Sequence, residues 1–370
     1  MNNKEKWTCA AIDHGVAIFP NGKIGPCCLI DPEYLKPISV ISHTDRFADL
    51  ASPDGHFGPA ACQKCNSSEH NNITSYRQMF NSIKNSDANG LQFVDIRNTN
   101  LCNLKCRYCG PHFSNQWAKE LEYDITLQHQ SIDEYKHLLL TDSLHWMYFT
   151  GGEPMVNADH WQVLEELISS GQSRNIKLLY NSNLTSLKFK DKNIFEIWKQ
   201  FKRVDILCSI DAVGEPLEYI RSGSTWNDIE KNILELLSMP ESNINIKLSP
   251  VMSILNIWFV EELCEFAQQH NLDLSPIILT GPTYLSIDVI PDALRDLALD
   301  KINSLKKYKI EETIILKMID LVTNNVNSFM FQHTLNHIML LDKMRNEKLL
   351  EILPFKSVVQ DLVLKNYEYQ

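Results

Sequence analysis

The chain has 370 residues, 44% of them hydrophobic, which is enough for one large domain or for two to three smaller ones. Acidic residues outnumber basic ones by 46 to 35, and the net charge of −11 makes nucleic acid an unexpected partner. No apolar run reaches the roughly 18 residues of a membrane span, and Met1–Lys6 does not open a signal peptide, so we expect a cytoplasmic protein without membrane contact. Ten cysteines in a reducing compartment favour metal ligation over disulfides.

The first region, about residues 1–88, is rich in cysteines and in loops. Residues 16–26 predict a hairpin with its turn at Asn21-Gly22, which would bring Cys9 close to Cys27. The other cysteines of this region are Cys28, adjacent to Cys27, and the C-x2-C pair Cys62 and Cys65. Four such thiols can close a metal site, and their spacing fits a structural zinc ion as well as an iron–sulfur cluster.

Strand and helix signals alternate from about residue 90 to 282, which predicts a parallel sheet with right-handed crossovers. The expected strands are 91–97, 145–149, 176–180, 204–210, 244–251 and 272–279. The helices between them include 157–171 and 257–270, where apolar residues recur at helical spacing. From about residue 291 the pattern is helical only, over 291–307, 310–323 and 333–344.

Three cysteines follow the first of these strands at C-x3-C-x2-C spacing: Cys102, Cys106 and Cys109. Three local thiolates would hold three irons of a cubane cluster and leave the fourth iron open, as a catalytic metal requires. A zinc knuckle with a distant fourth ligand is the alternative, although zinc motifs usually come as paired C-x2-C units.

Polar residues also follow the later strands. Gly151-Gly152-Glu153 comes after strand 145–149, where glycines let the backbone approach a ligand closely. Asn183 follows the third strand, and Ser209 and Asp211 alternate with apolar residues at the end of the fourth. Taken alone, Gly151-Gly152-Glu153 is a strand-to-helix turn, Asn183 is a turn-forming asparagine, and the nearby Arg221 is a surface ion-pair partner.

The cysteine motif with Tyr108 before its last cysteine resembles the signature of radical S-adenosylmethionine (SAM) enzymes. The pattern of Cys9, Cys27, Cys62 and Cys65 resembles the auxiliary-cluster module of the SPASM/twitch branch, here placed before the barrel. The resemblance implies an α/β fold with a partial (β/α)6 TIM-like barrel. It divides the chain into an auxiliary iron–sulfur module at 1–88, a barrel at 89–288 and a helical region at 289–370.

The resemblance also implies the cofactors and the residues that bind them. A SAM-binding 4Fe–4S cluster would be held by Cys102, Cys106 and Cys109, and a second, auxiliary cluster by Cys9, Cys27, Cys62 and Cys65. Cys27 is preferred over Cys28 because it directly follows Gly22–Pro26 at the family spacing. The residues expected to contact SAM are Tyr108, Gly151, Gly152, Glu153, Asn183, Ser209, Asp211 and Arg221. Leu184 stands where the family has glycine, and Ser114, Trp117, Asp342 and Arg345 match the twitch branch without an assigned chemistry.

The implied activity is reductive cleavage of SAM to a 5′-deoxyadenosyl radical that abstracts hydrogen from a substrate C–H bond, an oxidoreductase-type reaction. By analogy with the branch, the substrate is a peptide, as in natural-product maturation; the alternatives are a sugar, a nucleoside or another small molecule. An electron donor such as flavodoxin or ferredoxin is expected as a partner. A scaffold that binds zinc or a cluster without catalysis is the competing class. The sequence identifies no catalytic side chain.

Overall fold

The structure is a computed structural model, and it describes residues 8–42, 47–50, 60–70, 74–124, 127–239, 243–324 and 326–353. The ends of the predicted module and of the predicted helical region, 1–7 and 354–370, therefore lie outside the described residues. Within the described part no helix is both long and apolar enough to cross a membrane.

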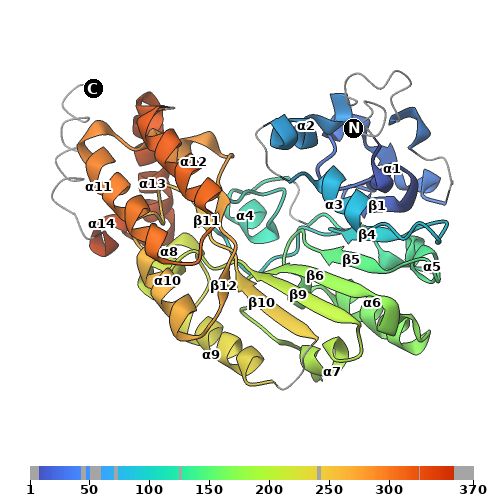
Figure 1. The fold of residues 1–370 in the computed structure, drawn as a ribbon. Coiled ribbons are helices and arrows are strands. Elements are labelled where there is room, and N and C mark those ends of the chain that lie inside the picture. The colour runs from blue at the N-terminus through green and yellow to red at the C-terminus, as the bar shows by residue number, and fades with distance from the viewer. Residues whose placement is uncertain are drawn as a thin grey trace.

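A nine-stranded sheet runs through the molecule in the order β12-β10-β9-β6-β5-β4-β1-β2-β3 (Figure 1). Its barrel strands pair in parallel and are β4 Phe93–Ile96, β5 Trp146–Phe149, β6 Lys177–Ser182, β9 Arg203–Cys208, β10 Ile244–Leu248 and β12 Asp273–Leu274. These strands correspond to the six predicted ones. Together with the crossover helices they confirm the α/β fold and are consistent with a partial TIM-like barrel.

The last two predicted strands each break at a proline. Pro250 ends the run that begins with β10, and Pro276 ends the run that begins with β12, since proline cannot donate to the strand ladder. The residues beyond each proline, β11 Val251–Met252 and β13 Ile277–Ile278, pair with each other in a separate two-stranded sheet. A second small sheet joins β7 Lys188–Phe189 to β8 Lys192–Asn193.

The N-terminal region shares the sheet of the barrel. The predicted hairpin forms as β1 Gly15–Ile18 and β2 Lys23–Gly25, and β1 also pairs in parallel with β4, with Gly15 opposite Phe93. The predicted boundary at residue 88 therefore divides one continuous sheet. The other elements of this region are α1 Ala10–His14, β3 Lys36–Pro37, α2 Gln63–His70 and α3 Tyr76–Ile83.

The two faces of the sheet are covered by different parts of the chain. Helices α6 Ala158–Ser169 and α7 Ile194–Trp198 lie on one side, and the N-terminal α1 and α3 lie on the other (Figure 1). The buried side chains alternate accordingly: Met147 and Phe149 join the large core with Trp161, while Trp146 and Tyr148 join a small cluster with Phe80. The N-terminal region thus packs against the face of β4 and β5 that points away from α6 and α7, which we call the interior face.

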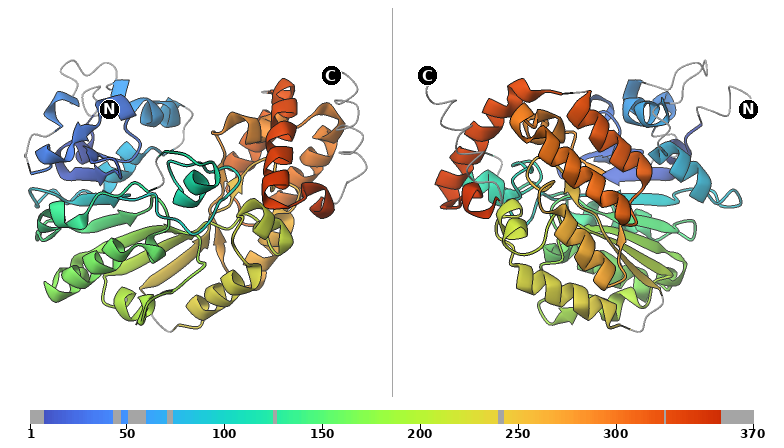
Figure 2. Two further views of the ribbon diagram at one scale, coloured as in Figure 1. Left: turned by 180° about the vertical axis from the view of Figure 1, so that it is seen from behind. Right: turned by 60° about the vertical axis from the view of Figure 1, so that its left-hand side comes forward.

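The remaining helices close the barrel and extend beyond it. They are α4 Asn115–Glu120, α5 Lys136–Leu139, α8 Glu215–Ile220, α9 Trp226–Leu237, α10 Val260–Gln269, α11 Asp292–Ser304, α12 Glu312–Thr323, α13 Phe331–Arg345 and α14 Leu349–Ile352. The predicted C-terminal helices form within a few residues of their expected ends. Figure 2 shows α13, in red, beside the loop that carries α4.

Candidate active site

The three cysteines of the C-x3-C-x2-C motif lie in the loop between β4 and α4. Their thiols are free, and burial raises the pKa of Cys109 to about 12 and that of Cys102 above its ordinary range. Neighbouring thiols add to both pKa shifts, since Cys106 lies near Cys102 and near Cys109. Three soft donors with no fourth cysteine in the same loop fit an iron–sulfur cluster with one open iron.

Gly151-Gly152-Glu153 packs against this loop. The amide of Gly152 donates to Thr99 O at 3.0 Å, and the amide of Glu153 donates to Leu101 O at 2.8 Å. A Cβ on Gly152 would lie 2.0 Å from Leu101 O, and Gly151 has a φ of +103°. Both glycines are therefore required here, one by close backbone approach and the other by its left-handed conformation.

The carboxylate of Glu153 joins the ends of β5 and β6. It is buried and accepts from Ser182 Oγ at 2.8 Å, from the amide of Asn183 at 2.7 Å and from the amide of Met155 at 3.2 Å. Burial raises its pKa, and these hydrogen bonds oppose that shift. The carboxylate of Glu153 is thus engaged by groups of the protein itself at the ends of β5 and β6.

Asn183 and Leu184 form the turn after β6. Asn183 Nδ2 donates to Asn103 Oδ1 at 3.0 Å, so this side chain reaches directly to the cysteine loop. Leu184 has a φ of +53° and is fully buried. A leucine therefore adopts the left-handed conformation at the position where the family has glycine, because burial of its side chain offsets the backbone cost.

Asp211 is the polar centre of the site. Its Oδ2 accepts from Tyr108 OH at 2.6 Å, and its Oδ1 accepts from the amide of Val251 at 2.8 Å. Arg221 Nε lies 2.8 Å from Oδ2 without pointing at it, so this contact is an ion pair rather than a hydrogen bond. Arg221 Nη1 also approaches Cys106 Sγ at 3.7 Å. The structure thus brings Tyr108, Asp211 and Arg221 to the cysteine loop.

Ser209 is the least engaged of the predicted residues. Its amide donates to Ser182 O at 2.8 Å, which extends the pairing of β9 with β6 past the strand ends, and the residue is half-buried. On β6, Asn181 lies opposite Leu207, and its Oδ1 is a buried acceptor with no hydrogen-bond partner among the described residues.

The cysteines of the N-terminal region gather at a second place. Cys9, Cys27, Cys62 and Cys65 line one cavity with Arg77 and Phe80. Burial, together with the neighbouring thiols Cys62 and Cys65, raises the pKa of Cys9 to about 11. The donor set, four thiols around one apolar pocket, fits a closed metal site. Among the described residues, no group of three or more His, Cys, Asp or Glu side chains lies close enough to hold a single metal ion.

Cys28 points elsewhere. Its thiol lies against Asp95, and burial together with that carboxylate holds the pKa of Cys28 well above its ordinary value. Asp95 is buried and pairs with Arg97 at 3.1 Å, and Tyr148 lies beside both. Sequence reasoning missed this polar group on the interior face. The signal was present in Asp95 and Arg97, which alternate with the apolar Val94 and Ile96 and so share one side of the strand.

Comparison with known proteins agrees with this geometry. Residues 96–267 match the profile of the Radical SAM superfamily. This part of the chain is a radical SAM domain. The superfamily is one of enzymes and implies a 4Fe–4S cluster and SAM as cofactors.

The curated relatives match only part of their own length. GTP 3′,8-cyclase of Campylobacter lari is 23% identical over 180 residues, 48% of this chain and 52% of that protein. The 7-carboxy-7-deazaguanine synthase of Thermoplasma acidophilum is 25% identical over 116 residues, 31% of this chain and 51% of that one. The chain thus spans about half the length of these relatives. Among solved structures, Streptococcus suis SuiB bound to the precursor peptide SuiA is 16% identical, with 73% of this chain and 58% of that chain covered and a TM-score of 0.41.

Proposed function

We propose that the chain is a radical SAM enzyme whose cluster is held by Cys102, Cys106 and Cys109. The observation that carries this proposal is the hydrogen bonding of Gly152 and Glu153 to the backbone that leads into the cysteine loop. The two segments lie so close that a Cβ on Gly152 would be 2.0 Å from Leu101 O. A 4Fe–4S cluster held by these cysteines would supply the electron for cleavage of SAM to methionine and a 5′-deoxyadenosyl radical, which would take hydrogen from a substrate C–H bond.

The residues around the loop would bind and orient SAM. The backbone carbonyls of Gly151 and Gly152 would accept from the amino group of SAM, while Arg221 suits its carboxylate because a guanidinium pairs with that anion. Asp211 already pairs with Arg221 and accepts from Tyr108, so it would fix both side chains beside Cys106. Asn183 and Ser209 are the proposed polar contacts on the side of β6 and β9.

We further propose a second, auxiliary iron–sulfur cluster on Cys9, Cys27, Cys62 and Cys65. The shared cavity of these four thiols supports it, and the position of Cys28 against Asp95 supports Cys27 as the ligand of that pair. The chain would then consist of the auxiliary module at 1–88, the barrel at 89–288 and the helical region at 289–370. A structural zinc ion in the module is the competing occupant.

The proposed substrate is a peptide, which rests on the resemblance of the module to the SPASM/twitch branch. A purine nucleotide or nucleoside is the second candidate, because the matched relatives are named as a GTP cyclase and a deazaguanine synthase. The one-electron reductant would be a flavodoxin or ferredoxin, with the protein acting in the cytoplasm.

The test is product analysis under anaerobic conditions. The reconstituted protein with SAM and dithionite should release 5′-deoxyadenosine. When the true substrate carries deuterium at the reacting carbon, that deuterium should appear in the 5′-deoxyadenosine. Candidate peptides and GTP are compared by that deuterium transfer. A protein that retains metal but forms neither 5′-deoxyadenosine nor a methylated product would be a scaffold, and the proposed function would then fail.

A further inference from the structure

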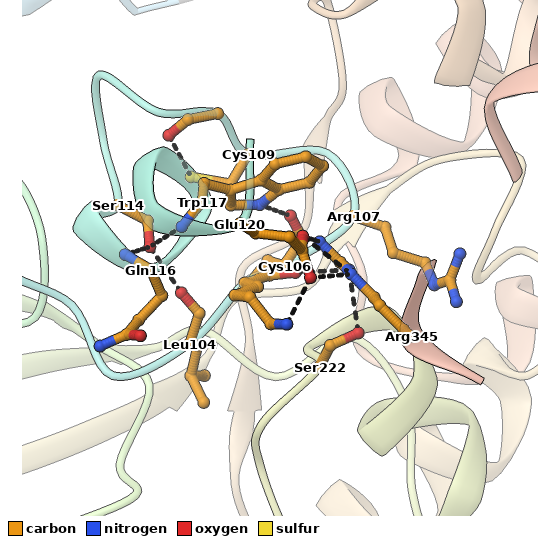
Figure 3. A network of polar contacts seen from close by, with 12 residues as sticks. Leu104, Cys106, Arg107, Cys109, Ser114, Gln116, Trp117, Glu120, Ser222 and Arg345 are labelled. Atoms are coloured by element: carbon orange, nitrogen blue, oxygen red, sulfur yellow. Dashed lines mark hydrogen bonds and ion pairs between the residues drawn. The ribbon is translucent and has the colours of Figure 1, made fainter. Parts of the chain in front are cut away.

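The backbone of the cysteine loop is held by side chains from two other elements. Four successive carbonyl oxygens, those of residues 104–107, each lie within hydrogen-bond distance of a side chain from α13 or from the start of α4. Figure 3 shows Ser114, Trp117 and Arg345 around this loop. The pairs are Ser114 Oγ to Leu104 O at 2.7 Å, Arg345 Nη1 to Lys105 O at 2.9 Å, Trp117 Nε1 to Cys106 O at 2.8 Å and His337 Nε2 to Arg107 O at 3.5 Å.

Arg345 also binds side chains outside the loop. Its side chain is 2% exposed, and its guanidinium binds both carboxylate oxygens of Glu120, with Nη2 at 2.7 Å from Oε2. Nη1 donates to Ser222 Oγ at 3.0 Å as well as to the loop, and the guanidinium carbon lies 4.6 Å from the ring centre of Trp117. Only a planar fork with several donors can satisfy these partners together.

A second buried arginine fastens the same loop to the end of α13. The side chain of Arg107 is 1% exposed and pairs with Asp342 at 2.7 Å and with Glu347 at 2.5 Å. Asp342 also accepts from Tyr219 OH, and its other oxygen accepts from the amide of Leu349 at the start of α14. The charges of this network balance, three cations (Lys105, Arg107, Arg345) against three carboxylates (Glu120, Asp342, Glu347). Because this network adds no net charge beside the loop, we infer that its main effect is to fix the position of the loop backbone.

We propose that α13 is part of the SAM-cluster site and that Arg345 is a positioning residue for Cys106. Arg345 holds the carbonyl before Cys106 and the indole that holds the carbonyl of Cys106 itself. A residue of the C-terminal helical region thus helps to hold the cysteine loop, although Arg345 and Lys105 are 240 residues apart in the sequence. This inference rests on the proposed function of the loop.

The first test uses hydrogen exchange in the protein without iron. The amides of Lys105 and Arg107 donate to Ser222 O and Ile220 O, so the wild-type loop should be protected. Arg345→Met should raise exchange in a peptide covering 102–109 by about tenfold or more, the factor given by about 1.4 kcal/mol of local opening. Arg345→Lys should behave like Arg345→Met, because an ammonium cannot replace the fork. Lys343→Met on the exposed side of α13 is the matched control and should leave exchange unchanged.

The second test reconstitutes the same variants with iron. Arg345→Met should lose SAM-loop iron, or SAM binding by on the order of 100-fold, since small displacements of a site are costly. Iron at Cys9, Cys27, Cys62 and Cys65 should stay. If Arg345→Met does not fold, Trp117→Phe is used instead, because it keeps an aromatic side chain and removes the N–H that donates to Cys106 O. This variant should show the same loss of SAM-loop iron or SAM binding with the module iron retained. Rescue by Arg345→Lys, or wild-type exchange and iron in both Arg345→Met and Trp117→Phe, would overturn the inference. A wild-type protein that holds no SAM-binding cluster would instead refute the proposed function.

Discussion

The two cysteine sites of this molecule are built in opposite ways. Cys102, Cys106 and Cys109 lie on one short loop, whose backbone is fixed by α4, α13 and the segment 220–222. The module instead draws Cys9, Cys27 and the Cys62/Cys65 pair from three separate segments around a small core that includes Phe80 and Trp146. The first site is therefore shaped by the protein itself, and we expect the second to need a bound metal to tie its three segments together.

The largest effect is expected from removing the loop thiols. The triple variant Cys102→Ala/Cys106→Ala/Cys109→Ala should form no 5′-deoxyadenosine and should bind about half of the wild-type iron, because a 4Fe–4S cluster needs these ligands. Its fold should persist, since the loop backbone is held by other side chains. Iron analysis, circular dichroism and product chromatography check this. Unchanged 5′-deoxyadenosine would show that the three thiols are not the ligands of the catalytic cluster.

Gly152→Ala should come next. The new Cβ would meet Leu101 O at 2.0 Å, so the cysteine loop or the Gly151–Glu153 segment must move. We expect SAM cleavage to fall on the order of 100-fold, as for a misplaced reacting group. Gly110→Ala is the matched control, because a Cβ on Gly110 meets nothing within 4 Å. Equal rates for the two variants would mean that the close approach at Gly152 does not matter for activity.

Loss of the module site should separate the two halves of the reaction. Cys62→Ala/Cys65→Ala should keep the SAM cluster and still form 5′-deoxyadenosine, but it should lose turnover of substrate to product. Its melting temperature should fall by roughly 2–4 °C for each kcal/mol of lost stability. Thermal melts and product analysis check both claims. Full product formation would make the module structural and favour zinc there.

The smallest but most specific effect concerns the adjacent pair Cys27 and Cys28. Cys27→Ala should lower module iron, because Cys27 lines the cavity with the other three thiols. Cys28→Ser should leave iron content unchanged, because its thiol lies against Asp95 and Arg97. Iron and sulfide analysis of the two variants gives the answer, and the reverse pattern would exchange the roles of the two cysteines.

Much of this arrangement is predictable from local sequence. The strand positions follow from apolar runs, and the two departures, at Pro250 and Pro276, follow from proline's missing N–H. Leu184 departs from glycine at a position of positive φ, where core packing overrides backbone preference.

Long-range pairing is what the sequence does not reveal. Hydrophobic periodicity does not specify contacts between residues that are far apart in the sequence. Examples are the pairing of Gly15 with Phe93 in the sheet and the ion pair of Arg345 with Glu120. For the same reason the sequence identifies Ser114, Trp117, Asp342 and Arg345 as features without a role, whereas the structure connects them to one loop.

We propose that the loop holds a cluster with one open iron and that the module holds a closed site. Mössbauer spectroscopy of the anaerobically reconstituted protein, with and without SAM, tests this directly. We expect about eight irons in two 4Fe–4S clusters, with SAM changing the spectrum of a single iron in only one of them. Stoichiometric zinc without iron, or a spectrum that SAM leaves unchanged, would contradict it.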